Sequence, residues 1–388
     1  MTYRLTSEHD ELRAVVRELA DERIAPRAAE IDAKSEFPWD LKELLAQQDL
    51  LGTCFPEAYG GTNLDGVSQA ILVEEIARAD ATTSLIPIVQ KLGALPIIIA
   101  GSDHQKQRYF PRLASGEWLA AFALTEAAAG SDVASNRMKA TRDGDDYLLN
   151  GSKRFITHGS IANVITAFAL TDADAGGRKG MSAFIVETDT PGFNAPRTEH
   201  KMGIRGSPTA ELTFDDVRVP AQNRLGEEGD GFKIAMATLD HSRLGVAAQA
   251  VGIAQGALDA AVHYAADRKQ FGQRVVDFEA IQFMLADMAS QTEAARQLVY
   301  AAAARADDNV PDLPYWTSAA KLIAGDTAMK VTTDAVQVLG GYGYITEYPV
   351  ERMMRDAKIT QLYEGTQQIQ RLLVARQLLA RSGVPARP

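Results

Sequence analysis

The stretch "ATRDGDDYLLNGSKRFITHGSIANVITAFAL", residues 140–170, decides the fold because it interrupts a chain whose two ends both read as helix. Its runs of β-prone residues are separated by the pairs Asp143-Gly144 and Asn150-Gly151. Asp-Gly and Asn-Gly favour two-residue hairpin turns, because both central positions of such a turn require positive φ. The stretch therefore predicts antiparallel strands with tight turns at both pairs.

Periodicity on either side of this stretch predicts helices. In "ELRAVVRELADERIAPRAAEI" (11–31) the apolar residues recur at helical spacing, and "GVAAQAVGIAQGALDAAVHYAADRKQFG" (245–272) is rich in Ala, which allows helices to approach closely. "MSAFIVE" (181–187) and "AELTFDDVRVP" (210–220) continue the β pattern. We predict an α+β fold with an N-terminal helical domain at 1–118, a middle β-domain at 119–228 and a C-terminal helical bundle at 229–388.

Composition excludes several classes of function. The formal net charge of −11 argues against a protein that follows a phosphate backbone, so no nucleic-acid partner is expected. Apolar patches such as "LGALPIIIAG" (92–101) are about half the ~20 residues of a membrane span. With Cys54 alone and six scattered histidines, neither a disulfide framework nor a metal site is expected. The N-terminus has no signal pattern, so the expected location is cytoplasmic.

Single motifs leave two interpretations open. The chain has neither a GxGxxG that opens a helix after a strand nor a Walker A loop. "QVLGGYGYI" (337–345) fits a tight turn between helices or a backbone that approaches a phosphate or a ring. Arg268 in "DRKQFG" (267–272) fits a helix end or a fork onto a pyrophosphate. Glu364, which precedes Gly365, fits either a solvated helix end or a base held by a turn.

Taken in order, the fragments resemble the acyl-CoA dehydrogenase family over nearly the whole chain. Eight of them follow one another in family order and at family spacing: "LTE…GSD" (124–132), "GSKRFIT" (151–157), "KMGIRGSPTAELTFDDVRVP" (201–220), "YAADRKQFG" (264–272), "FMLADMA" (283–289), "TDAVQVLGGYGY" (333–344), "PVERMMRDAKITQLYEGTQQIQ" (349–370) and "ARQLLA" (375–380). The resemblance implies that family's architecture, in which a β-barrel or β-sandwich lies between two helical domains. It also implies FAD as cofactor, an acyl-CoA substrate and a homotetramer.

The resemblance assigns site residues by position. The cofactor-binding residues it implies are Phe122, Leu124, Thr125, Ser131, Phe155, Thr157, Arg268, Phe271, Gln337, Gly340, Gly341, Thr366 and Gln368. The substrate-binding residues it implies are Ser131, Asp240, Arg243, Tyr363 and Gly365. Arg268, Phe271, Gln337 and the glycines through Gly341 correspond to the region that reaches the FAD of a neighbouring subunit.

Glu364 matches the catalytic base of the family. The implied reaction removes the α-proton of a saturated acyl-CoA to Glu364 while a β-hydride passes to flavin N5, which gives a trans-2-enoyl-CoA. Burial raises the pKa of such a carboxylate, and Gly365 gives the turn the freedom to aim it. A family subgroup places its base at the position of Ser242, which here cannot serve, and this favours the short- to medium-chain type.

Three functions remain distinct at this point. The first is a dehydrogenase that passes electrons to an electron-transfer flavoprotein. The second is an oxygen-using flavoenzyme on the same fold, such as an acyl-CoA oxidase or a monooxygenase, which oxygen uptake with substrate separates from the first. The third is a non-catalytic acyl-CoA-binding protein, which predicts a damaged base or flavin set, whereas Glu364, Arg268 and Gln337 are present. The acyl chain, and whether CoA or a carrier protein bears it, stay open.

Overall fold

The computed structural model describes residues 3–384 and begins with helices. These are α1 (Ser7–Leu19), α2 (Ala28–Lys34), α3 (Trp39–Gln47), α4 (Gly66–Ala79), α5 (Ala81–Ala100) and α6 (Asp103–Ala114). Between α1 and α2 the chain passes through a π-helical turn (Ala20–Ile24) and a 3₁₀ turn (Ala25–Arg27). Pro26 lies in this irregular segment, as expected of a residue without a backbone N–H.

The middle of the chain forms one mixed sheet of eight strands. The strands are β1 (Ala120–Ala123), β2 (Lys139–Asp143), β3 (Asp146–Thr157), β4 (Val164–Leu170), β5 (Met181–Glu187), β6 (Phe193–Thr198), β7 (Thr209–Pro220) and β8 (Arg224–Leu225), with the short helix α7 (Gly177–Gly180) before β5. Their order is β6-β7-β3-β2-β4-β5-β8, and β1 pairs in parallel with β4. The predicted α+β architecture, with helices on both sides of a β-domain in the chain, is confirmed.

Of the two predicted hairpin turns, one is confirmed and the other is wrong. Asp143 pairs with Asp146 across a tight turn in which Gly144 has φ +63°. Gly151 instead lies inside β3, which runs on to Thr157, at a register shift opposite β7. A Cβ at Gly151, where φ is +144°, would lie 3.0 Å from the Met138 backbone. Gly151 therefore forms a β-bulge and allows close contact with the neighbouring strand. Both a bulge and a tight turn require the backbone freedom of glycine.

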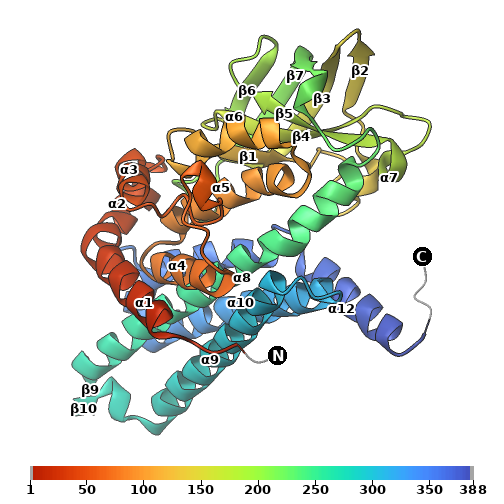
Figure 1. Ribbon diagram of the computed structural model, residues 1–388. Coiled ribbons are helices and arrows are strands. Elements are labelled where there is room, and N and C mark those ends of the chain that lie inside the picture. The colour runs from red at the N-terminus through yellow and green to blue at the C-terminus, as the bar shows by residue number, and fades with distance from the viewer. Residues whose placement is uncertain (1–2, 385–388) are drawn as a thin grey trace.

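The C-terminal region is a helical bundle built on α8 (Gly231–Asp267). It is completed by α9 (Glu279–Asp307), α10 (Leu313–Leu339), α11 (Val350–Ala357) and α12 (Gln367–Arg381), with the short strands β9 (Lys269–Gln270) and β10 (Gln273–Arg274) after α8. Figure 1 shows α8 running from the β-domain down through the bundle. The same helix therefore spans the β-domain and the bundle.

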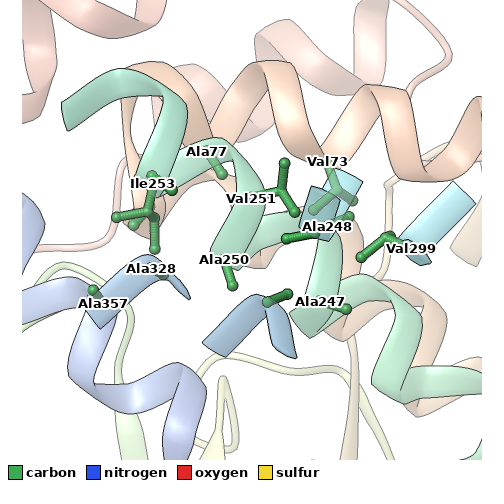
Figure 2. Packing of buried hydrophobic residues seen from close by; sticks show 14 of the residues in the cluster. Val73, Ala77, Ala247, Ala248, Ala250, Val251, Ile253, Val299, Ala328 and Ala357 are labelled. Carbon is green, nitrogen blue, oxygen red and sulfur yellow. The ribbon is translucent and has the colours of Figure 1, made fainter. Parts of the chain in front are cut away.

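The core around α8 is packed with small side chains. Ala247, Ala248 and Ala250 of α8 are fully buried, and in Figure 2 they lie among residues of α4, α9, α10 and α11. Two glycines let α4 come closer still, because a Cβ at Gly252 would lie 2.2 Å from the carbonyl oxygen of Glu74, and one at Gly256 would lie 2.3 Å from that of Arg78. The predicted close packing through small residues is therefore what the C-terminal helices show.

A buried polar network joins the first helices to the C-terminal bundle. The carboxylate of Glu74 on α4 accepts hydrogen bonds from Tyr300 Oη (2.6 Å) and Arg296 Nε (2.8 Å), both on α9. Arg13 of α1 donates to Tyr300 Oη (2.5 Å) and to Glu75 (2.7 Å). Because Glu74 and Glu75 are buried, these partners are what makes their charge tolerable there.

Two helices, α5 and α8, are long and apolar enough by composition to cross a membrane. In each, 72% of the apolar window is buried within the molecule, as in the core helix of a globular protein.

The close approach of α8 to α4 leads to the first prediction. Gly252→Ala forces a methyl group against the Glu74 carbonyl, so we expect overpacking to lower the free energy of unfolding by about 1–3 kcal/mol. Gly245→Ala on the same helix is the matched control, since its nearest neighbour is the Ile88 side chain at 3.4 Å. Denaturant unfolding of both variants measures the difference, and equal midpoints would contradict the prediction.

Candidate active site

Glu364 lies in a left-handed turn that leads into α12. Its φ is +54°, which is uncommon for a residue other than glycine, and Gly365 follows with φ +91°. A Cβ at Gly365 would lie 2.7 Å from Gln370 Nε2, so position 365 requires glycine for both conformation and space. Non-glycine residues in such conformations cluster at functional sites, where the surrounding structure must hold them.

Two buried side chains hold this turn through its carbonyl groups. Gln370 Nε2 donates to the carbonyl oxygens of both Glu364 and Gly365, at 3.0 Å each. Lys321 Nζ of α10 donates to the Gly365 carbonyl (2.7 Å) and to Gln367 Oε1 (3.2 Å). The backbone N–H of Glu364 donates to no acceptor among residues 3–384, which leaves it available to a ligand.

The Glu364 side chain faces α8. Ser242 Oγ donates to Glu364 Oε2 at 2.5 Å. Burial raises the pKa of the Glu364 carboxyl, while the Ser242 hydrogen bond and the charges of Arg243 and Lys321 act in the opposite direction. The carboxyl group is therefore neither a solvated helix end nor locked in an ion pair, and it has the environment of a base.

The predicted substrate-binding residues other than Ser131 lie around this turn. Arg243 is buried and pairs with Asp240 at 2.5 Å, on the same helix as Ser242. Tyr363 precedes the base, and its hydroxyl donates to the side chain of Gln249. Ser131 lies apart, exposed in the loop after β1.

A second group of predicted residues meets where β1 ends beside β3. The backbone N–H of Arg154 donates to the Thr125 carbonyl (2.8 Å), which joins the segment of Phe122, Leu124 and Thr125 to that of Phe155 and Thr157. Phe155 has φ +59° and its side chain is 58% exposed. An aromatic ring left open at the end of a strand offers a flat apolar surface, which suits a planar ring system.

Lys153 fixes the segment of Leu124 and Thr125 through buried hydrogen bonds. Its side chain is fully buried, and Nζ donates to the Leu124 carbonyl (3.1 Å) and to Glu126 Oε1 (2.9 Å). Burial lowers the pKa of Lys153 to about 8. Glu126 also accepts from the backbone N–H groups of Arg137 and Met138, so one ion pair fixes the whole loop.

The remaining predicted cofactor residues lie on other parts of the bundle. The Arg268 guanidinium lies over the Tyr342 ring (5.2 Å), which brings the end of α8 next to the turn of Gly340 and Gly341 that follows Gln337. Phe271 is 93% exposed with φ +51°. Thr366 caps α12 by accepting from Ile369 N, and Gln368 is exposed on that helix. Among the described residues, no hydrogen bond or ion pair joins Arg268 or Phe271 to the Glu364 turn.

Sequence reasoning missed three residues that hold the site in place. Lys153, Lys321 and Gln370 are buried polar residues, and each of them donates to the backbone carbonyl of a predicted site residue. Lys153 and Gln370 lie inside fragments that resemble the family, and this position indicates a role in the site. Nothing in the sequence around Lys321 distinguishes it from an exposed helical lysine.

A β-domain between two helical regions, with a partly buried carboxylate on a glycine turn, is the arrangement that the resemblance to acyl-CoA dehydrogenases predicts. The chain belongs to the acyl-CoA dehydrogenase family, whose N-terminal, middle and C-terminal domain models match residues 6–117, 121–217 and 229–379. It is an oxidoreductase acting on acyl-CoA, as this family is.

Relatives over the full length agree with the domain matches. The chain is 52% identical over 377 residues to the probable acyl-CoA dehydrogenase FadE25 of Mycobacterium tuberculosis, with 97% of each chain covered. Butyryl-CoA dehydrogenase from Megasphaera elsdenii superposes with a TM-score of 0.94 at 45% identity, covering 98% of this chain and all of that one. A chain solved in work on the electron-transferring flavoprotein of Acidaminococcus fermentans superposes with a TM-score of 0.95 at 47% sequence identity. The match covers 98% of this chain and 100% of that one.

Members of this family are FAD flavoproteins, and FAD is the cofactor of this chain. The residues present fit the group, since the exposed Phe155 ring and the Thr125 segment form one surface joined by a backbone hydrogen bond. The family assignment thus agrees with an observation of the structure itself.

The ion pair under the β1–β3 surface leads to the second prediction. Lys153→Met removes both hydrogen bonds that fix Leu124 and Glu126, so we expect the dissociation constant of FAD to rise about tenfold, for a loss of roughly 1.4 kcal/mol. Titration of the apoprotein with FAD measures it. Lys139→Met on β2, where the side chain is exposed, is the control, and an equal FAD affinity in both variants would refute the role of Lys153.

Proposed function

We propose that the protein catalyses α,β-dehydrogenation of a short-chain acyl-CoA thioester, with Glu364 as the base that removes the α-proton. The observation that carries this proposal is the Glu364 turn. It combines a partly buried carboxyl group, a backbone N–H without an acceptor among residues 3–384, and a left-handed conformation fixed from two sides.

Each part of the turn has a chemical task in this proposal. Burial raises the pKa of Glu364 towards that of a useful base, and Ser242 holds the carboxylate before substrate arrives. The free N–H of Glu364 donates to the thioester carbonyl, where it stabilises the charge that develops as the α-proton leaves. When bound, FAD accepts the β-hydride.

Arg243 and Asp240 are proposed to orient the CoA portion of the substrate. Their ion pair lies one residue from Ser242, on the helix that faces the base. Among residues 3–384 the buried Nε atom of Arg243 has no hydrogen-bond partner. A buried donor without an acceptor is costly, so it is well suited to receive a polar group of a ligand.

The substrate is proposed to be short because a buried, hydrogen-bonded glutamine lies next to the residue that precedes the base. Gln249 is fully buried on α8, and its Nε2 donates to the Ala81 carbonyl and to Ser84 Oγ of α5, at 3.0 Å each. Its Oε1 accepts from Tyr363, the neighbour of Glu364. This network ties α5 and α8 to the residue before the base, and we propose that it limits the room for an acyl chain there. The similarity to a butyryl-CoA dehydrogenase also supports a short chain.

The electron acceptor and the oligomeric state belong to the same proposal. The similar chain solved in work on an electron-transferring flavoprotein supports such a protein as the acceptor, rather than oxygen. A homotetramer is supported by large apolar side chains that are exposed on the C-terminal region, namely Phe271, Phe283, Tyr344, Leu372 and Leu378. We propose that these side chains meet other copies of the chain, because interfaces between subunits cover exposed apolar groups.

Removal of the base is the main test of the proposal. Glu364→Gln keeps the shape of the side chain but cannot accept a proton, so we expect flavin reduction by butyryl-CoA to slow by about 10³-fold or more. Anaerobic stopped-flow bleaching of the flavin band measures the rate. Glu347→Gln, at an exposed position before α11, is the matched control. A Glu364→Gln rate within twofold of the parent would exclude Glu364 as the base.

The Gln249 network leads to a prediction on chain length. Gln249→Ala removes the side chain that bridges α5 and Tyr363, so we expect kcat/KM for octanoyl-CoA relative to butyryl-CoA to rise about tenfold. Steady-state assays with the two thioesters measure this ratio. Gln255→Ala, on the same helix but bonded to Asp259 and Arg296, is the control. An unchanged ratio in Gln249→Ala would show that the pocket is limited elsewhere.

A further inference from the structure

Lys321 holds the Gly365 carbonyl, but the reaction proposed above gives no task to its buried positive charge. It lies on α10, with its side chain fully buried, and α10 approaches the catalytic turn closely at Gly325. A Cβ at Gly325 would lie 3.0 Å from both Gln367 Nε2 and the Thr360 carbonyl oxygen. A buried ammonium group is costly to desolvate, so its position against this turn calls for a reason.

The contacts of Lys321 all lead to the residues that follow the base. Nζ donates to the Gly365 carbonyl at 2.7 Å and to Gln367 Oε1 at 3.2 Å. Gln370, which follows the turn in the chain, donates to that same Gly365 carbonyl and also to the carbonyl of Glu364. Lys321 is thus the charged member of a pair of donors that fixes the left-handed turn.

The charge of Lys321 also reaches the carboxylate of Glu364. The charged groups around the base are Lys321 on α10 and Arg243 on α8, and both favour its ionised form. Arg243 forms an ion pair with Asp240. Lys321 forms no ion pair among the described residues and donates hydrogen bonds to the Gly365 carbonyl and the Gln367 side-chain amide. The negative charges that raise the pKa of Lys321 are those of Glu364 and Asp326. Burial lowers the pKa of Lys321 to about 8, so the group is charged at neutral pH.

We propose that Lys321 is a positioning residue for Glu364: it fixes the turn through the Gly365 carbonyl, and its positive charge, held beside that turn, favours the ionised form of the carboxyl group. This inference rests on the proposed role of Glu364 as the base. It assigns two separable effects to one side chain: the hydrogen bond sets the geometry of the turn, and the charge sets the pH range in which the base is active.

The test uses the FAD-loaded protein and measures the pH dependence of flavin reduction by butyryl-CoA. The rate rises with pH as Glu364 ionises, and loss of a nearby positive charge makes ionisation harder. In Lys321→Met we therefore expect the midpoint to move to higher pH by about one unit, together with a lower maximal rate. Lys321→Gln keeps a donor for Gly365 without the charge, so the midpoint moves while the maximal rate is largely retained.

Two further variants separate charge from position. Gln370→Met removes the neutral donor, so we expect a lower maximal rate with an unchanged midpoint. Lys330 on α10 is exposed and pairs with Asp334, so we expect Lys330→Met to change neither the maximal rate nor the pH midpoint. A merely structural role of Lys321 would lower the yield of folded protein without moving the midpoint.

The outcomes distinguish this inference from the proposed function. An infrared titration of the protonated carboxyl band, taken as a difference against Glu364→Gln, gives the same midpoint without substrate. If both Lys321 variants titrate like the parent, the inference is wrong, while a Glu364→Gln variant without activity leaves the base assignment standing. If no acyl-CoA reduces the flavin of the parent protein, the proposed function itself fails.

Discussion

The structure depends on the ability of α8 to touch several helices at once, and small side chains make this contact possible. Ala and Gly on α8 bring α4 to within the distance at which one added methyl group would meet a carbonyl oxygen. The same helix carries Ser242, Arg243 and Gln249, which face the base. The tight packing that joins the N-terminal helices to the bundle therefore also fixes the side of the site opposite Glu364.

The site illustrates how a carboxyl group is kept reactive inside a protein. Burial raises the pKa of Glu364, whereas a direct ion pair would make it too weak a base. Here one hydroxyl donor contacts the carboxylate, and the nearby cations are bonded to other groups. The energetic cost of this arrangement includes the left-handed backbone, which the carbonyl contacts of Lys321 and Gln370 hold in place.

The architecture could be predicted from the sequence because helical and β patterns are local. The Asp143-Gly144 turn was identified for the same reason, while Asn150-Gly151 was misread because a bulge and a turn need the same backbone freedom. Gly365 was expected to shape the catalytic turn, but the positive φ of Glu364 itself was not. Lys321 acts across 44 residues of sequence, and no local pattern records which carbonyl a buried lysine will meet.

The network of Arg13, Glu74, Arg296 and Tyr300 has a consequence for the order in which the chain matures during synthesis. Its members are separated by up to 287 residues, so the first helices emerge from the ribosome long before α9 exists. Until then the carboxylate of Glu74 lacks its α9 partners and stays hydrated. Packing of α4 against α8 would then bury an unpaired charge, which costs desolvation free energy. We therefore expect the N-terminal helices to complete their folding only after α9 has been made, and a nascent chain arrested before residue 296 to hold them in an open state.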